Sequence, residues 1–156
     1  MKVLVLCFSK TGHTREAAEA VAQGIRSAGS EAELTQATHF RDDQLAAYDA
    51  LIVASPCWAG SAGMPMLPKP LAGALAKLGD KDLAQKRCGG ISVHAAKGGE
   101  GTLRLLGETA KQKGCTDFVP GPVARAGTLL SVNRGPSVKP QDKERCRAYG
   151  SEFVGG

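Results

Sequence analysis

Length, composition and charge exclude several classes of protein at once. The chain has 156 residues, 42% of them hydrophobic, which is enough for one domain with a single core. No apolar run approaches the roughly 18 residues of a membrane-spanning helix, and no cleavable leader is recognisable. We therefore expect a single cytoplasmic domain over residues 1–156, without a membrane partner.

The net charge of +5 lies entirely in the second half of the chain. Residues 1–78 hold 7 basic and 7 acidic side chains, whereas residues 79–156 hold 13 and 8. Nucleic-acid binding would also need a recognition motif, or a basic stripe interleaved with aromatic side chains. Aromatic residues make up only 4% of the chain, so we expect a solvated basic surface and no nucleic-acid partner.

The five cysteines indicate a reducing compartment. Their number is odd and no Cys-x-x-Cys pair occurs. The three histidines have no metal-ligand spacing among themselves or with the cysteines, so we expect no metal. Four cysteines lie in apolar patterns and are interpreted as small core residues: Cys7, Cys88, Cys115 and Cys146.

In chain order, short apolar runs alternate with helical patterns. Strands are expected at 3–8, 31–38, 50–54, 88–93 and 118–123, the last interrupted by prolines at an edge. Helical periodicity covers 14–25, 71–78, 102–113 and 141–154, and a Gly-, Pro- and Ser-rich loop covers 125–139. This alternation predicts an α/β fold with helices on both faces of a parallel sheet.

In such a sheet, ligands bind beyond the carboxyl ends of the strands. That rule selects the loops at 9–14, 55–65 and 94–102. In the first loop, Ser-Lys-Thr-Gly-His-Thr, hydroxyl groups and a flexible glycine precede a helix, whose free N–H groups attract anions. The loop lacks the spacing of ATP, GTP or dinucleotide sites, so it indicates a mononucleotide phosphate. The alternative is an ordinary N-capped helix.

The other two loops are also suited to a flat ligand. The second carries the only tryptophan, Trp58, which could lie against an aromatic ring or cap the core beneath its own loop. The third has three glycines among residues 98–101, so its backbone could approach a planar ligand. The alternative for this third loop is a flexible turn.

With these loops the chain resembles the flavodoxin family over nearly its whole length. The resemblance rests on the 9–14 loop, on Ser-Pro-x-Trp-x-Gly at 55–60, on the Gly-rich 97–101 and on the stretch 135–150. It implies a three-layer sandwich whose five-stranded sheet has the order 2-1-3-4-5, with FMN bound non-covalently.

The resemblance also implies residue roles. The FMN phosphate would be held by Ser9, Lys10, Thr11, Gly12, His13 and Thr14. The isoalloxazine would be bordered by Pro56, Cys57, Trp58, Ala59 and Gly60, with Trp58 stacked on the ring and the Gly60 peptide near flavin N5. The pyrimidine end would be lined by Ala95, Ala96, Lys97, Gly98, Gly99 and Gly101.

The chain departs from the family pattern in two ways. Ala95 and Ala96 stand where the family commonly has a stacking aromatic residue, which would leave the outer face of the ring open. Many members are acidic, whereas this chain has a pI near 9.1. Lys97 would then stabilise the negative charge that reduction adds to the flavin, giving a less negative potential.

We therefore expect an FMN-binding electron-transfer protein, whose partner is another redox protein or a small-molecule acceptor. The open outer face favours an alternative, an NAD(P)H-dependent reductase of a quinone, a flavin or another small acceptor. A third possibility is an interaction module without flavin. Cys57 would relay redox chemistry or simply pack beside the ring. His13 and His94 would bind phosphate, protonate a substrate, or be ordinary loop histidines.

Overall fold

The middle layer of the fold is a parallel sheet of five strands. The computed structural model describes residues 1–95, 97–126 and 137–156. The strands of the sheet are β1 (Lys2–Cys7), β2 (Glu31–Gln36), β3 (Ala50–Pro56), β6 (Arg87–His94) and β7 (Phe118–Arg125). Their spatial order is β2-β1-β3-β6-β7, and every pairing is parallel. Counted within this sheet, the order is 2-1-3-4-5, which confirms the predicted topology.

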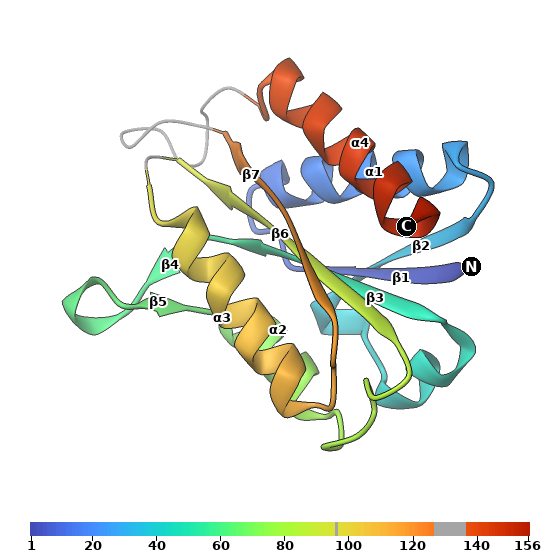
Figure 1. Ribbon diagram of the computed structural model, residues 1–156. Helices are drawn as coiled ribbons and strands as arrows, with labels where there is room; N and C mark the ends of the chain where they lie inside the picture. The colour runs from blue at the N-terminus through green and yellow to red at the C-terminus, as the bar shows by residue number, and fades with distance from the viewer. Residues whose placement is uncertain (96, 127–136) are drawn as a thin grey trace.

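Helices cover both faces of the sheet (Figure 1). The helices are α1 (His13–Ser27) and α4 (Pro140–Gly155) on one face, and α2 (Lys69–Ala76) and α3 (Gly99–Gln112) on the other. Alternate side chains of each strand enter the two halves of the core. In β1, Val3 and Val5 pack beneath α1 and α4, whereas Leu4 and Leu6 pack beneath α2 and α3. Burial on both faces explains why this strand is a continuous apolar run.

Both edge strands carry features that discourage further pairing. β7 is an edge strand, as its prolines predicted, and its pairing with β6 shifts register between Gly90 and Ser92. At the other edge, the Arg26 guanidinium donates from α1 to the Ala32 carbonyl of β2, at 2.8 Å. That bond satisfies a backbone acceptor which an edge strand otherwise leaves open.

The structure adds short elements that the sequence pattern did not predict. Trp58–Ala59 (β4) and Pro65–Met66 (β5) pair as a small antiparallel hairpin. Among the described residues, 3₁₀ helices also occur at η1 (Ala37–His39), η2 (Asp42–Ala47) and η3 (Ser61–Gly63). The expected strand at 31–38 ends at Gln36 because η1 follows it directly. The expected helix at 102–113 already begins at Gly99, after a left-handed Gly98 with φ +99°.

The structure also tests the cysteines expected in the core. The four cysteines expected in the core are buried. Within the described ranges, no helix has the length and apolarity needed to cross a bilayer, and no cluster of His, Cys, Asp and Glu could hold a metal ion. Most of the expected loop at 125–139 lies outside the described residues.

Candidate functional site at the carboxyl edge of the sheet

A cavity of about 320 Å³ opens where four of the parallel strands end. Its walls come from the segments that follow β1, β3, β6 and β7, so four distant parts of the sequence meet there. The lining residues are Lys10, Thr11, His13, Thr14, Pro56, Cys57, Trp58, Val93, His94, Ala95 and Ala126. This volume lies within the roughly 300–1,000 Å³ of small-molecule sites.

The first wall is the turn between β1 and α1. Gly12 has φ +92°, a left-handed conformation that a side chain would strain, and its N–H donates to Ser9 Oγ at 2.9 Å. Gly12 is the N-cap of α1 and, as a glycine, has no side chain with which to cap the helix itself. The first N–H groups of a helix have no partner within the helix. This turn therefore presents backbone donors and the positive end of the α1 dipole at the cavity.

Hydroxyl and imidazole groups add to these donors. Thr14 lies in the first turn of α1, only 2% exposed, and lines the cavity. Thr11 Oγ1 lies 3.2 Å from Nδ1 of His13, so the two side chains are held together. Lys10 supplies a positive charge at the same wall. This combination of hydroxyls, N–H groups and a cation suits an anion with several oxygens.

The second wall contains Trp58. Its ring meets Phe8 edge to face, with centroids 5.9 Å apart and an interplanar angle of 87°. The side chain remains 38% exposed, although it lines the cavity. β4 holds Trp58 opposite Met66 of β5. An indole fixed from one edge and partly open to solvent has surface left for an aromatic ligand.

Gly60 closes the turn of the β4–β5 hairpin. Its N–H donates to the Met64 carbonyl at 2.8 Å, and its own carbonyl accepts from the Gly63 N–H at 3.2 Å. Gly60 is not among the residues that line the cavity. Its contact with flavin N5 stays a prediction, and that contact would have to share or replace one of these two bonds.

Cys57 joins the second wall to the third. Its N–H donates to the Val93 carbonyl at 2.8 Å, and its thiol lies 3.5 Å from the carbonyl oxygen of Lys97. A Cβ at Gly98 would lie 2.9 Å from the Cys57 sulfur, closer than such atoms approach one another. The small residue at 98 therefore allows the thiol and the start of α3 to pack together.

The third wall is the end of β6. The Gly99 N–H donates to Nδ1 of His94 at 3.2 Å, and the Ala126 N–H donates to the His94 carbonyl at 3.1 Å. Arg125 Nε donates to the Ala95 carbonyl at 3.4 Å. These bonds tie the segment after β6 to α3 and to the end of β7.

The cavity unites many of the residues selected from the sequence. Those that line it are Lys10, Thr11, His13, Thr14, Pro56, Cys57, Trp58 and Ala95. Ser9 and Gly12 form the turn behind them, and Ala59 belongs to β4. Gly98, Gly99 and Gly101 instead shape the start of α3, where Lys97 is exposed. Ala96 lies outside the described residues.

Sequence reasoning did not select Val93 and Ala126 as site residues, and it assigned His94 no single role. Val93 and Ala126 line the cavity without any chemical signal, because they are apolar residues at the ends of strands. For His94 the sequence leaves three roles open: phosphate binding, protonation of a substrate, or an ordinary loop histidine. Its place at the end of a buried strand was the signal that could have selected it.

Cys7 ends β1 directly beneath the site. Burial raises the pKa of its thiol from 9.0 to about 11, and the nearby Arg15 offsets only part of that effect. Cys7 is therefore a neutral core thiol at pH 7 and contributes no nucleophile to the site.

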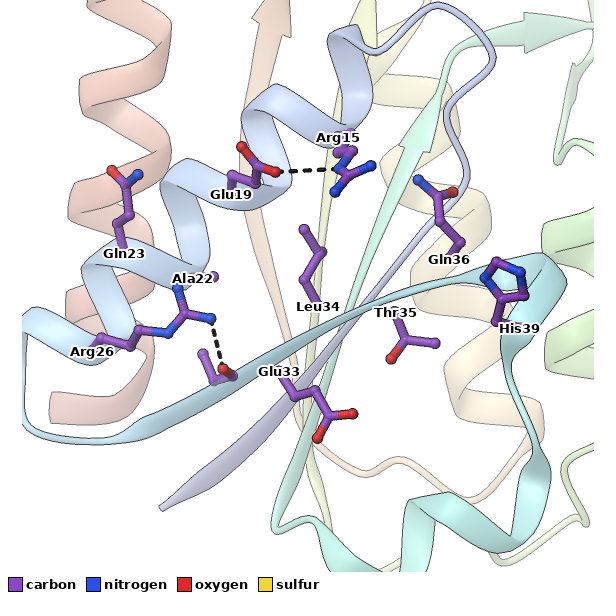
Figure 2. A pocket seen from close by; sticks show the side chains of 11 residues that line it. Arg15, Glu19, Ala22, Gln23, Arg26, Glu33, Leu34, Thr35, Gln36 and His39 are labelled. Atoms are coloured by element: carbon purple, nitrogen blue, oxygen red, sulfur yellow. Dashed lines mark hydrogen bonds and ion pairs between the residues drawn. The ribbon is translucent and has the colours of Figure 1, made fainter.

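A larger hollow of about 770 Å³ lies between α1 and β2 (Figure 2). Its charged side chains already have partners within the fold. Arg15 pairs with Glu19 at 3.2 Å, and Arg26 bonds to the Ala32 carbonyl. It is lined mainly by one helix and one edge strand, so the loops that follow the strands do not converge on it. The cavity at the carboxyl edge is the stronger candidate.

Comparison with known proteins agrees with this architecture. The family model described as Flavodoxin matches residues 5–129. The chain belongs to the flavodoxin family.

Solved flavodoxins share the fold of this flavodoxin-family chain. A flavodoxin from Streptococcus pneumoniae TIGR4 superposes with a TM-score of 0.77 at 20% identity, covering 99% of each chain. Flavodoxin 1 from Bacillus cereus gives 0.71 at 20% identity, covering 99% of this chain and 98% of its own. A WrbA-like flavodoxin from Agrobacterium tumefaciens gives 0.65 at 26% identity, covering 99% of this chain and 95% of its own.

Curated relatives of this flavodoxin-family chain match a shorter stretch. A protein named NAD(P)H dehydrogenase (quinone) from Gluconacetobacter diazotrophicus is 40% identical over 35% of this chain and 38% of its own length. The protein of the same name from Methylocella silvestris is 42% identical, over 33% and 36%. The match thus spans little more than a third of these relatives.

Proposed function

We propose that this protein binds FMN non-covalently in the cavity at the carboxyl edge and transfers electrons between that flavin and a partner. The observation that carries the proposal is the start of α1, where the N-cap Gly12 has no side chain to bond the first N–H groups and where two hydroxyl groups and a lysine line the cavity. Membership of the flavodoxin family supports the same assignment.

The β1–α1 turn would hold the phosphate of FMN. The backbone N–H groups at the start of α1 and the hydroxyls of Thr11 and Thr14 would donate to its oxygens, and Lys10 would balance its charge. The oxygen of Ser9 already accepts from the Gly12 N–H, so its own O–H remains free to donate to an anion.

The remaining walls would hold the ring. Trp58 would offer its indole surface to one face, while Pro56 and Cys57 would border an edge. Ala95 adds only a methyl group to the third wall, which supports an outer face accessible to an electron acceptor. When bound, FMN supplies the redox chemistry; these residues bind it, orient it and set the charge around it.

Fluorescence titration with FMN tests this proposal, because Trp58 is the only tryptophan of the chain. We expect FMN to quench Trp58 with micromolar or tighter affinity, and riboflavin, which lacks the phosphate, to bind more weakly. Thr14→Val should weaken FMN binding about tenfold or more, since one hydrogen bond to a charged group contributes roughly 1.5–3 kcal/mol. The exposed Thr38→Val serves as the matched control. Absence of saturable FMN binding would overturn the proposal.

A second candidate function is that of an NAD(P)H-dependent reductase of quinones or other small acceptors. The relatives named NAD(P)H dehydrogenase (quinone) and the small Ala95 side chain favour it. Mixing the FMN-loaded protein anaerobically with NADPH or NADH separates the two candidates. Rapid loss of the visible flavin absorption, without any added reductase, would support the enzyme. Reduction only through an added reductase would support the carrier.

A further inference from the structure

His94 is the last residue of β6 and lines the candidate cavity. Its ring accepts a hydrogen bond from the Gly99 N–H, with 3.2 Å between Nδ1 and the backbone nitrogen. Its carbonyl accepts from the Ala126 N–H at 3.1 Å. The residue is therefore held through its backbone and through one nitrogen of its side chain.

The bond to Gly99 determines which ring nitrogen carries the proton. A backbone N–H can only donate, so Nδ1 must present its lone pair. In a neutral imidazole one nitrogen donates and the other accepts, and the proton then belongs to Nε2. A ring protonated on Nδ1 would place two donors opposite each other and break the contact.

The packing around Gly99 preserves this arrangement. A Cβ at position 99 would overlap a methyl group of Val123 and would lie 3.2 Å from Nδ1 of His94. Glycine is thus the residue that lets the start of α3 approach the imidazole. Gly99 is buried and His94 half-buried, so the bond between the two residues is partly buried.

We propose that His94 is a ligand-binding residue whose Nε2–H donates to an oxygen acceptor of FMN in the cavity. This inference rests on the proposed function, since it takes FMN as the occupant. The phosphate, the ribityl chain and the pyrimidine carbonyls of FMN all provide oxygen acceptors. The Gly99 contact occupies Nδ1 as an acceptor, so Nε2–H is the ring donor that remains for these oxygens.

The tautomer is measurable without any ligand. Long-range proton–nitrogen NMR spectra of the uniformly ¹⁵N-labelled, FMN-free protein distinguish Nδ1–H from Nε2–H. The chain has only three histidines, and the spectrum of His94→Asn identifies the signals of residue 94. We expect the Nε2–H form at pH 8. An Nδ1–H form would overturn the inference.

Binding measurements test the donor. His94→Asn keeps an acceptor oxygen near Gly99 but removes Nε2–H. We expect it to weaken FMN affinity about two- to tenfold, with an unfolding midpoint close to that of the wild type. His94→Gln, whose longer amide can place a donor near the same point, should recover part of the affinity. The exposed His39→Asn is the matched control and should bind FMN like the wild type.

The outcomes separate the two proposals. A His94→Asn protein that binds FMN as tightly as the wild type would overturn the role of His94 and leave the proposed function standing. A wild-type protein that takes up no FMN would overturn the proposed function together with the assigned target of the donor. Titration with riboflavin locates the acceptor. If His94→Asn weakens the binding of both FMN and riboflavin, the acceptor is a ribityl or ring oxygen.

Discussion

Gly24 of α1 and Gly150 of α4 lie at one helix crossing, each against the backbone of the other helix. A Cβ at Gly24 would overlap the carbonyl of Arg147, and a Cβ at Gly150 would overlap the carbonyl of Val21. Both glycines are buried. The two helices can therefore pack at backbone distance over one face of the sheet. Because α1 also begins at the candidate site, this crossing helps to fix the orientation of the Gly12 turn.

We expect Gly24→Ala to lower the free energy of unfolding by about 1–3 kcal/mol, because the added methyl group has no space at the crossing. Gly73→Ala is the matched control. Gly73 lies inside α2 with nothing within 4 Å of its absent Cβ, so alanine there should stabilise by up to about 1 kcal/mol. Urea unfolding monitored by circular dichroism compares the two. Equal stability of the two variants would refute close packing at Gly24.

Trp58→Ala should weaken FMN binding by about 1–3 kcal/mol if the indole stacks on the ring. The side chain is partly exposed and already held edge to face by Phe8, so its loss should disturb the fold little. Trp58→Phe keeps an aromatic face and should retain more of the affinity. Equilibrium dialysis is the suitable measurement, because the alanine variant has no tryptophan fluorescence. Unchanged affinity would remove Trp58 from the flavin site.

Lys97→Glu should make the midpoint potential of the FMN-loaded protein more negative. Lys97 is exposed beside the start of α3, and its positive charge would stabilise the negative charge that reduction adds to FMN. With solvent screening, we expect a shift of about 10–40 mV for a two-electron couple. The control is Lys81→Glu, which reverses an exposed charge in the segment before β6, at the amino ends of the strands. A potential equal to that of the wild type would contradict the role of Lys97.

Iodoacetamide at pH 8 should modify the native protein at Cys57 alone. Cys57 is partly exposed, whereas the other four cysteines are buried. Burial also raises the pKa of Cys7 to about 11 and that of Cys146 to about 12, so neither supplies thiolate at this pH. Mass spectrometry should show one adduct in the native protein, five after denaturation and none in native Cys57→Ser. Bound FMN should slow the native reaction.

Stability should fall at alkaline pH. The pKa values of Cys7 and Cys146 rise from 9.0 when unfolded to about 11 and about 12 when folded, through burial. Below pH 9 both states keep these protons, so the difference in pKa does not make the free energy of unfolding depend on pH. Above pH 9 the unfolded chain loses these protons first, so the folded state is progressively disfavoured as pH rises towards 11. From these two thiols we expect the free energy of unfolding to fall by about 4 kcal/mol between pH 8 and 10.5, and by about half as much in Cys146→Ala.

The sequence alone was sufficient to predict the layers of this fold. The runs at 3–8 and 50–54 are apolar at successive positions, which is typical of a strand buried on both faces. The prolines at 120 and 122 indicated an edge strand, and β7 is one. The location of the candidate site was predicted by the same reasoning, because parallel strands bring their carboxyl ends to one edge and so bring the Ser9–Thr14 turn to the same cavity as Trp58.

Only the tertiary structure decided how the loops contact one another. The bond between Cys57 and the Lys97 carbonyl joins residues forty positions apart, and no local pattern encodes such a contact. The β4–β5 hairpin that engages Gly60 has strands of two residues, too short for periodicity to reveal. The tautomer inferred for His94 depends on the backbone of Gly99. Burial and alternation are properties of single segments, and these can be read along the chain. Hydrogen bonds between loops depend on where several segments meet, and that is settled only when the sheet and its helices are packed.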